Sequence, residues 1–128
     1  MPGAGPGMLK LLIIDDEQKI CELLSKYFSF KGYETRAVSR GEEAVVLAKV
    51  YQPDVVLLDL LMPGLGGVET LKQLKQLQPV PRVIMVSAAD HTDVAQGAIK
   101  LGADAFVCKP PSLPELERLI NGYWPSAK

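Results

Sequence analysis

Short apolar runs alternate with longer amphipathic segments along this chain. Five runs are candidate strands: Leu9–Ile14, Tyr33–Val38, Val55–Leu58, Arg82–Val86 and Ala105–Cys108. The first, third and fourth contain continuously hydrophobic stretches, which are typical of parallel strands that helices cover on both faces. The second run is more mixed, so we expect it at an edge of the sheet.

The segments after these runs carry apolar residues at helical spacing, so each predicts a helix with one buried face. The predicted stripes are Ile20, Leu23, Leu24, Tyr27 and Phe28; Ala44, Leu47 and Ala48; Val68, Leu71, Leu74 and Leu77; Val94, Ala95, Ala98, Ile99 and Leu101; and Leu116, Leu119 and Ile120. Ser39 lies three residues before Glu42, and this spacing predicts a capping box at the second helix. Ser112 and Glu115 predict another at the fifth helix. The alternation predicts an α/β fold: a five-stranded parallel sheet with five helices on both faces.

The composition is that of an ordinary globular protein, with 48% of the 128 residues hydrophobic and 23% charged. This length fits a single domain. The net charge of −1 gives no sign of a nucleic-acid or membrane surface, and no apolar run is long enough to span a bilayer. We therefore expect a cytoplasmic protein that contacts neither nucleic acid nor membrane directly.

The two ends of the chain differ in composition from the rest. Residues 1–7 are rich in Gly and Pro and are expected to form a flexible leader or a cloning remnant. Residues 8–124 are expected to form the domain, and residues 125–128 a tail or the start of a linker. Cys21 and Cys108 fit no metal-binding spacing, so we expect two buried, reduced thiols.

Polar residues follow four of the five runs. Asp15, Asp16 and Glu17 follow the first, Asp59 the third, Ser87 the fourth and Lys109 the fifth. Taken singly, each reads better as a turn residue, a cap or a solvated charge. Together they would meet at the carboxyl edge of the sheet, where ligands bind in such folds. Crowded carboxylates repel one another, and one lysine cannot balance three, so the pattern predicts a hard divalent cation such as Mg²⁺.

The residue set also limits the chemistry. The chain has no Gly-rich loop of the P-loop kind, and no His or Cys stands beside a serine. The one histidine, His91, is expected at the surface or at a helix start. What remains is a carboxylate nucleophile beside a metal, an ammonium and a hydroxyl, a set that suits phosphoryl transfer.

Four segments resemble the receiver domain of two-component response regulators. They are Leu11–Glu17, Val55–Gly64, Val86–Ala88 and Gly102–Pro110, and the resemblance extends from about Leu9 to Tyr123. It implies a flavodoxin-like fold with strand order 2-1-3-4-5. That order places the second strand at an edge, as its mixed pattern predicts.

The resemblance also implies roles for individual residues. Asp59 matches the phosphoacceptor, Asp15 and Asp16 match the acidic pair that holds Mg²⁺ with Asp59, and the main-chain carbonyl of Leu61 matches the group that completes the metal site. Lys109 and Ser87 match the groups that bind the phosphoryl oxygens, and Phe106 matches the aromatic switch residue. Leu61 and Ala89 match positions that tune hydrolysis of the phosphoryl group, and the Lys109–Pro110 bond matches a cis peptide bond.

The implied function is a phosphorylation-dependent switch in a two-component phosphorelay. A sensor histidine kinase or a phosphotransfer protein would donate the phosphoryl group, and the face formed by the fourth helix, fifth strand and fifth helix would shift. The domain would be no enzyme with an external substrate, although it would assist its own phosphorylation and dephosphorylation. Three features depart from the family pattern: Gly66-Gly67, which leaves the third helix without a side-chain cap, Phe106 in place of a frequent Tyr, and Pro111 after Pro110.

Other interpretations remain open from the residues alone. The chain could be a degenerate receiver that acts only as a protein-interaction module. A haloacid-dehalogenase type of enzyme is disfavoured because Leu61 replaces the second aspartate of its motif, and a flavin domain because the strand ends are acidic. Tyr123 and Trp124 suggest a homodimer through the last helix, with packing on the domain's own core as the alternative.

Overall fold

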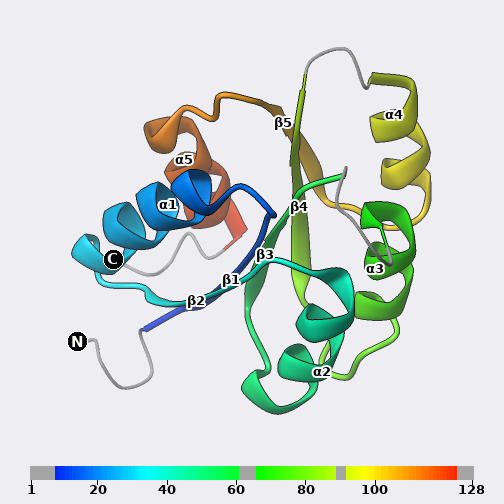
Figure 1. The fold of residues 1–128 in the computed structure, drawn as a ribbon, viewed down its shortest axis with the longest axis horizontal. Helices are drawn as coiled ribbons and strands as arrows, with labels where there is room; N and C mark the ends of the chain where they lie inside the picture. The colour runs from blue at the N-terminus through cyan, green and yellow to red at the C-terminus, as the bar shows by residue number, and fades with distance from the viewer. Residues whose placement is uncertain (1–7, 61–65, 89–91, 124–128) are drawn as a thin grey trace.

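A computed structural model describes residues 8–60, 66–88 and 92–123. A five-stranded parallel sheet lies at its centre (Figure 1). The strands are β1 (Lys10–Ile14), β2 (Glu34–Val38), β3 (Val55–Leu58), β4 (Arg82–Ser87) and β5 (Ala105–Cys108). The helices are α1 (Gln18–Phe30), α2 (Gly41–Tyr51), α3 (Gly67–Leu74), α4 (Thr92–Lys100) and α5 (Leu113–Tyr123).

The strand order is β2-β1-β3-β4-β5, and every neighbouring pair is parallel. This confirms the predicted flavodoxin-like order and the edge position of the second strand. The chain leaves β1 for β2 on one side and returns to β3 on the other. The strand order therefore reverses between β1 and β3, which opens a crevice at their carboxyl ends.

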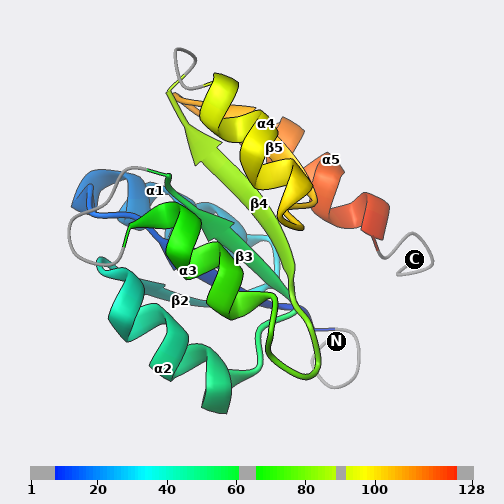
Figure 2. The ribbon, with the colours of Figure 1, turned by 90° about the vertical axis from the view of Figure 1, so that its right-hand side faces the viewer.

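The helices form two layers, with α1 and α5 on one face of the sheet and α2, α3 and α4 on the other (Figures 1 and 2). Successive side chains of a strand point to opposite faces. Leu12 and Ile14 therefore pack in the cluster under α2, α3 and α4, whereas Leu11 and Ile13 pack in the cluster under α1 and α5. Burial on both sides explains why Leu11–Ile14 of β1 and the whole of β3 are continuously hydrophobic.

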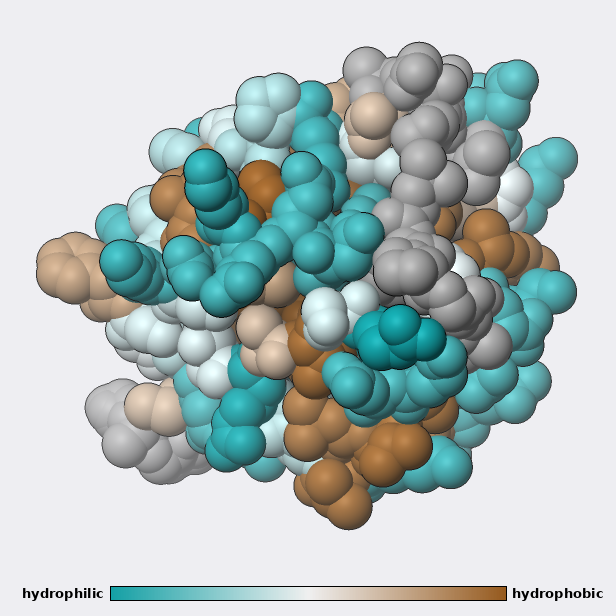
Figure 3. Space-filling model, in the orientation of Figure 1, coloured by the Kyte–Doolittle hydropathy of each residue, from teal (hydrophilic) through white to brown (hydrophobic). Residues whose placement is uncertain are grey.

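Helix faces are less regular than the predicted stripes. Leu23, Ile99 and Leu101 remain 43–47% exposed, so their predicted inward placement is wrong. Leu23 adjoins the buried Leu24, and because neighbouring helical residues point about 100° apart, the Leu23 side chain points away from that of Leu24. Figure 3 shows hydrophobic side chains gathered over the lower part of the molecule, where α2 exposes Val46 and Val50.

The helix starts match the sequence only in part. Glu115 donates its backbone N–H to Ser112 Oγ at 3.4 Å, which confirms Ser112 as a cap of α5. The predicted cap by Ser39 is wrong, because α2 begins one residue later, with Arg40 as an N-cap that makes no side-chain bond. At α3 the N-cap is Gly66, also without a side-chain bond, as expected.

Both cysteines are free thiols, but the expectation that both are buried is wrong. Cys21 is half-buried on α1. Cys108 is exposed, because it ends β5, the outer strand on that side of the sheet. Among the described residues, no helix combines the length and hydrophobicity needed to cross a membrane.

Candidate functional site: an acidic crevice at the sheet edge

Two buried aspartates meet at the carboxyl ends of β1 and β3. Asp15 and Asp59 directly follow the paired residues Ile14 and Leu58. The Asp59 N–H donates to the Ile14 carbonyl at 2.9 Å, and the Asp15 N–H donates to the Val38 carbonyl at 3.1 Å. The backbone hydrogen bonding therefore continues the sheet by one residue and fixes the main chain from which both carboxyl groups extend. Only 3% of Asp15 and 4% of Asp59 is exposed.

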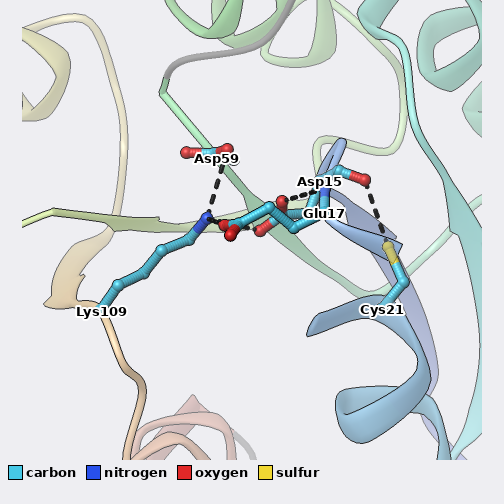
Figure 4. Close-up of polar contacts among 5 residues, drawn as sticks. All are labelled: Asp15, Glu17, Cys21, Asp59 and Lys109. Carbon is cyan, nitrogen blue, oxygen red and sulfur yellow. Dashed lines mark hydrogen bonds and ion pairs between the residues drawn. The ribbon is translucent and has the colours of Figure 1, made fainter. Parts of the chain in front are cut away.

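Lys109 reaches the same place from the end of β5 (Figure 4). Its N–H donates to the Ser87 carbonyl at 2.7 Å, which holds the main chain against β4. Its Nζ lies 2.9 Å from Asp15 Oδ2 and 3.4 Å from Asp59 Oδ2. Burial disfavours the charged ammonium, but hydrogen bonds to Glu17 and Asp15 and the charge of Asp59 outweigh this effect. The pKa of Lys109 is therefore raised, and the ammonium stays charged.

Glu17 is the third carboxylate in contact with Lys109. Its Oε1 lies 2.5 Å from Lys109 Nζ, and its backbone N–H donates to Asp15 Oδ1 at 2.9 Å. Glu17 is also the N-cap residue of α1. Sequence reasoning placed Glu17 at this edge but gave it no role; its position two residues after Asp15, at a helix start, was the available signal.

The carboxylates fit a hard divalent cation. Among the described residues, Asp15, Glu17 and Asp59 each bring one carboxylate oxygen within 4.8 Å of the others. Carboxylate oxygens are the ligands that Mg²⁺ prefers, with water and substrate phosphate as the rest. The acidic cluster therefore fits the predicted cation by its donor chemistry.

Asp16 lies apart from this cluster. It is exposed, and it lines a neighbouring hollow of about 480 Å³ together with Asp15, Cys21 and Glu43. Asp16 lies beyond the end of β1, in a bend, and it is not among the carboxylates that come within 4.8 Å of one another. The structure thus brings Asp15 and Asp59 together as expected, and the third carboxylate that contacts Lys109 is that of Glu17.

The family model for the response regulator receiver domain matches residues 11–121. The chain is a response regulator receiver domain. Sporulation initiation phosphotransferase F of Bacillus subtilis is 35% identical over 91% of this chain and 94% of its own length. Regulatory protein AtoC of Escherichia coli is 34% identical over 88% of this chain. The alkaline phosphatase synthesis regulator PhoP of Bacillus subtilis is 36% identical over 88%.

Solved structures agree with this assignment. The Francisella response regulator 1452 receiver domain has a TM-score of 0.82 and 33% identity, over 94% of this chain and 99% of its own. A CheY-like receiver domain protein from Methanospirillum hungatei has a TM-score of 0.87 at 24% identity, over 94% and 96%, and supports the fold alone. The receiver domain spans 24% of the length of AtoC and 47% of PhoP.

The two predicted switch residues, Ser87 and Phe106, lie on β4 and β5 of the receiver domain. Ser87 ends β4 and is 1% exposed, and its carbonyl accepts a hydrogen bond from the Lys109 N–H. Phe106 pairs with Met85 across β4 and β5 and packs, partly buried, against the cluster under α2, α3 and α4. The Lys109–Pro110 peptide bond is cis. Leu61, Ala89, His91 and Trp124 lie outside the described residues.

Cys21 adjoins the receiver domain's acidic crevice without adding a nucleophile. Its thiol donates to the Asp15 carbonyl at 3.2 Å. Burial, and then the charge of Asp15, raise the pKa of Cys21 to about 11. A thiol with this pKa remains protonated near neutral pH, so carboxylate chemistry is the chemistry that this site offers.

Proposed function

We propose that Asp59 accepts a phosphoryl group from a phosphohistidine of a partner sensor kinase or phosphotransfer protein. The observation that carries this proposal is the contact between the Lys109 ammonium and the buried Asp59 carboxylate, beside a second buried carboxylate, Asp15. The receiver domain then acts as a phosphorylation-dependent switch in a two-component phosphorelay.

In the transfer step, an oxygen of Asp59 forms a bond to phosphorus while the bond from phosphorus to the histidine nitrogen breaks. The electron pair leaves with the imidazole of the donor. Lys109, already next to Asp59, neutralises charge on the phosphoryl oxygens. After transfer, the Ser87 hydroxyl donates a hydrogen bond to one of those oxygens.

Asp15, Asp16, Asp59 and the main-chain carbonyl of Leu61 would hold Mg²⁺, with one of the paired aspartates acting through water. The bound ion supplies positive charge beside the transferred phosphoryl group. Asp15 and Asp59 support this assignment, since a single ammonium leaves their cluster with excess negative charge, whereas Asp16 lies apart from that cluster. The same groups assist the later loss of the phosphoryl group from Asp59.

The proposed conformational change involves movements of the Ser87 and Phe106 side chains. When Ser87 moves to the phosphoryl group, it frees space beside β4, and the Phe106 ring turns inward to fill it. Two arrangements of the face made by α4, β5 and α5 then differ in population, and a partner reads the difference.

A homodimer through the last helix stays a prediction. Tyr123 packs against the cluster under α1 and α5, and the Arg82 guanidinium lies 4.7 Å from the Tyr123 ring centroid. These contacts support packing on the domain's own core for this residue. Light scattering with and without a phosphate mimic tests the dimer, and a monomer in both conditions would exclude it.

Incubation with acetyl phosphate and Mg²⁺, followed by intact mass measurement, tests the proposed function. We expect one phosphoryl group on the wild type and none on Asp59→Asn. Asp93→Asn, which removes an exposed carboxylate at the start of α4, is the matched control and should be phosphorylated normally. A wild type that gains no phosphoryl group would instead support a degenerate receiver that only binds partners.

A further inference from the structure

Three carboxylates share the single ammonium of Lys109, and the phosphoacceptor is not the nearest. Lys109 Nζ lies 2.5 Å from Glu17, 2.9 Å from Asp15 and 3.4 Å from Asp59 (Figure 4). Glu17 and Asp15 are therefore the closest partners of the ammonium in this arrangement.

The three carboxylates differ in their exposure. The side chain of Glu17 is 59% exposed, whereas those of Asp15 and Asp59 are 4% and 6% exposed. The backbone of Glu17 is fixed, because its N–H donates to Asp15 Oδ1 and its carbonyl accepts from Ile20 and Cys21. Glu17 thus presents a carboxylate from a fixed point at the outer rim of the crevice.

A cation held by Asp15 and Asp59 would compete with Lys109 for the same oxygens and repel its ammonium. The ammonium must then move away from Asp15. Glu17 is the carboxylate of the cluster that does not bind the cation in this arrangement. Glu17 can retain the ammonium there, still close to Asp59.

We propose that Glu17 is a positioning residue for Lys109, which holds the ammonium at the rim while Asp15 and Asp59 bind the cation. This inference rests on the proposed cation-assisted phosphoryl transfer. Without Glu17, the ammonium has only Asp15 and Asp59 as partners in the described cluster, and it competes with the cation more strongly.

A double-mutant cycle tests the inference through Mg²⁺ affinity, measured by calorimetric titration of the full chain without a phosphodonor. We expect Glu17→Gln to raise the Mg²⁺ dissociation constant about two- to fivefold, the range of an exposed ion pair. In a Lys109→Met background this effect should vanish. Glu43→Gln is the matched control, because it removes an exposed carboxylate from the neighbouring hollow.

Each other result overturns the inference. An equal loss of affinity in both backgrounds means that Glu17 acts on the cation itself, and a loss no larger than that of Glu43→Gln means that only overall charge matters. Both results leave the proposed function standing if the wild type binds Mg²⁺ and is phosphorylated. A wild type that does not bind Mg²⁺ overturns the metal-assisted function and this inference with it.

Discussion

Gly67 lies so close to Leu60 that a Cβ on Gly67 would be 2.5 Å from the Leu60 Cα. The same Cβ would be 2.6 Å from the carbonyl oxygen of Asp59, and the Gly67 N–H donates to the Leu60 carbonyl at 3.1 Å. The start of α3 therefore packs directly against the backbone of Asp59, the proposed phosphoacceptor. Only glycine leaves room for this contact, because backbone atoms cannot rotate away as a flexible side chain can.

Gly67→Ala should lower the free energy of unfolding by about 1–3 kcal/mol, the usual cost of overpacking. It should also slow phosphorylation, because Asp59 must shift with its backbone. Urea unfolding and phosphorylation by acetyl phosphate measure the two effects. Gly97→Ala on α4 is the control: nothing lies within 4 Å of its added Cβ, so it should stabilise the protein by about 0.5–1 kcal/mol. A Gly67→Ala variant as stable as the wild type would contradict the packing argument.

The aspartyl phosphate should be long-lived. Leu61 and Ala89 lie two residues after Asp59 and Ser87, and neither side chain can orient an attacking water by hydrogen bonding. We expect loss of phosphate in Mg²⁺ buffer to take minutes or longer, and Leu61→Asn to accelerate it. The time course of the phosphorylated mass measures this rate, and a wild-type half-life of seconds would rule the idea out.

Tyr33 should make stability depend on pH in the alkaline range. Burial, and then the charge of Glu117, raise the pKa of Tyr33 from 10.0 to about 12. The folded state therefore keeps a proton that the unfolded chain loses, so this contribution is complete below pH 10 and disappears as pH rises toward about 12. The free energy of unfolding, measured with urea at each pH over this range, should fall less steeply for Tyr33→Phe than for the wild type. Identical pH dependence in the two proteins would show that Tyr33 does not contribute.

The strands could be predicted closely because each buried run ends at a polar residue. β3 begins and ends as predicted, and β4 extends one residue further, to Ser87. The meeting of Asp15, Asp59 and Lys109 followed from the same pattern, since parallel strands bring their carboxyl ends to one edge.

The parts that sequence reasoning missed depend on side-chain direction beyond the ends of regular elements. Glu17 and Asp16 are neighbours in the sequence, yet only Glu17 turns toward Lys109. The backbone of the turn before α1 decides this, and hydrophobic periodicity carries no information about it. Similarly, Ser39 does not cap α2, because the helix begins one residue later than the sequence spacing predicts.

Among the aspartates of this edge, Asp59 should be the residue that carries the phosphoryl group. Borohydride reduction converts an aspartyl phosphate to homoserine, which marks its position for peptide mass spectrometry. After treatment with acetyl phosphate and Mg²⁺, we predict homoserine at residue 59 and aspartate unchanged at residues 15 and 16. Homoserine at residue 15 or 16, or no homoserine in a protein that binds Mg²⁺, would contradict the account.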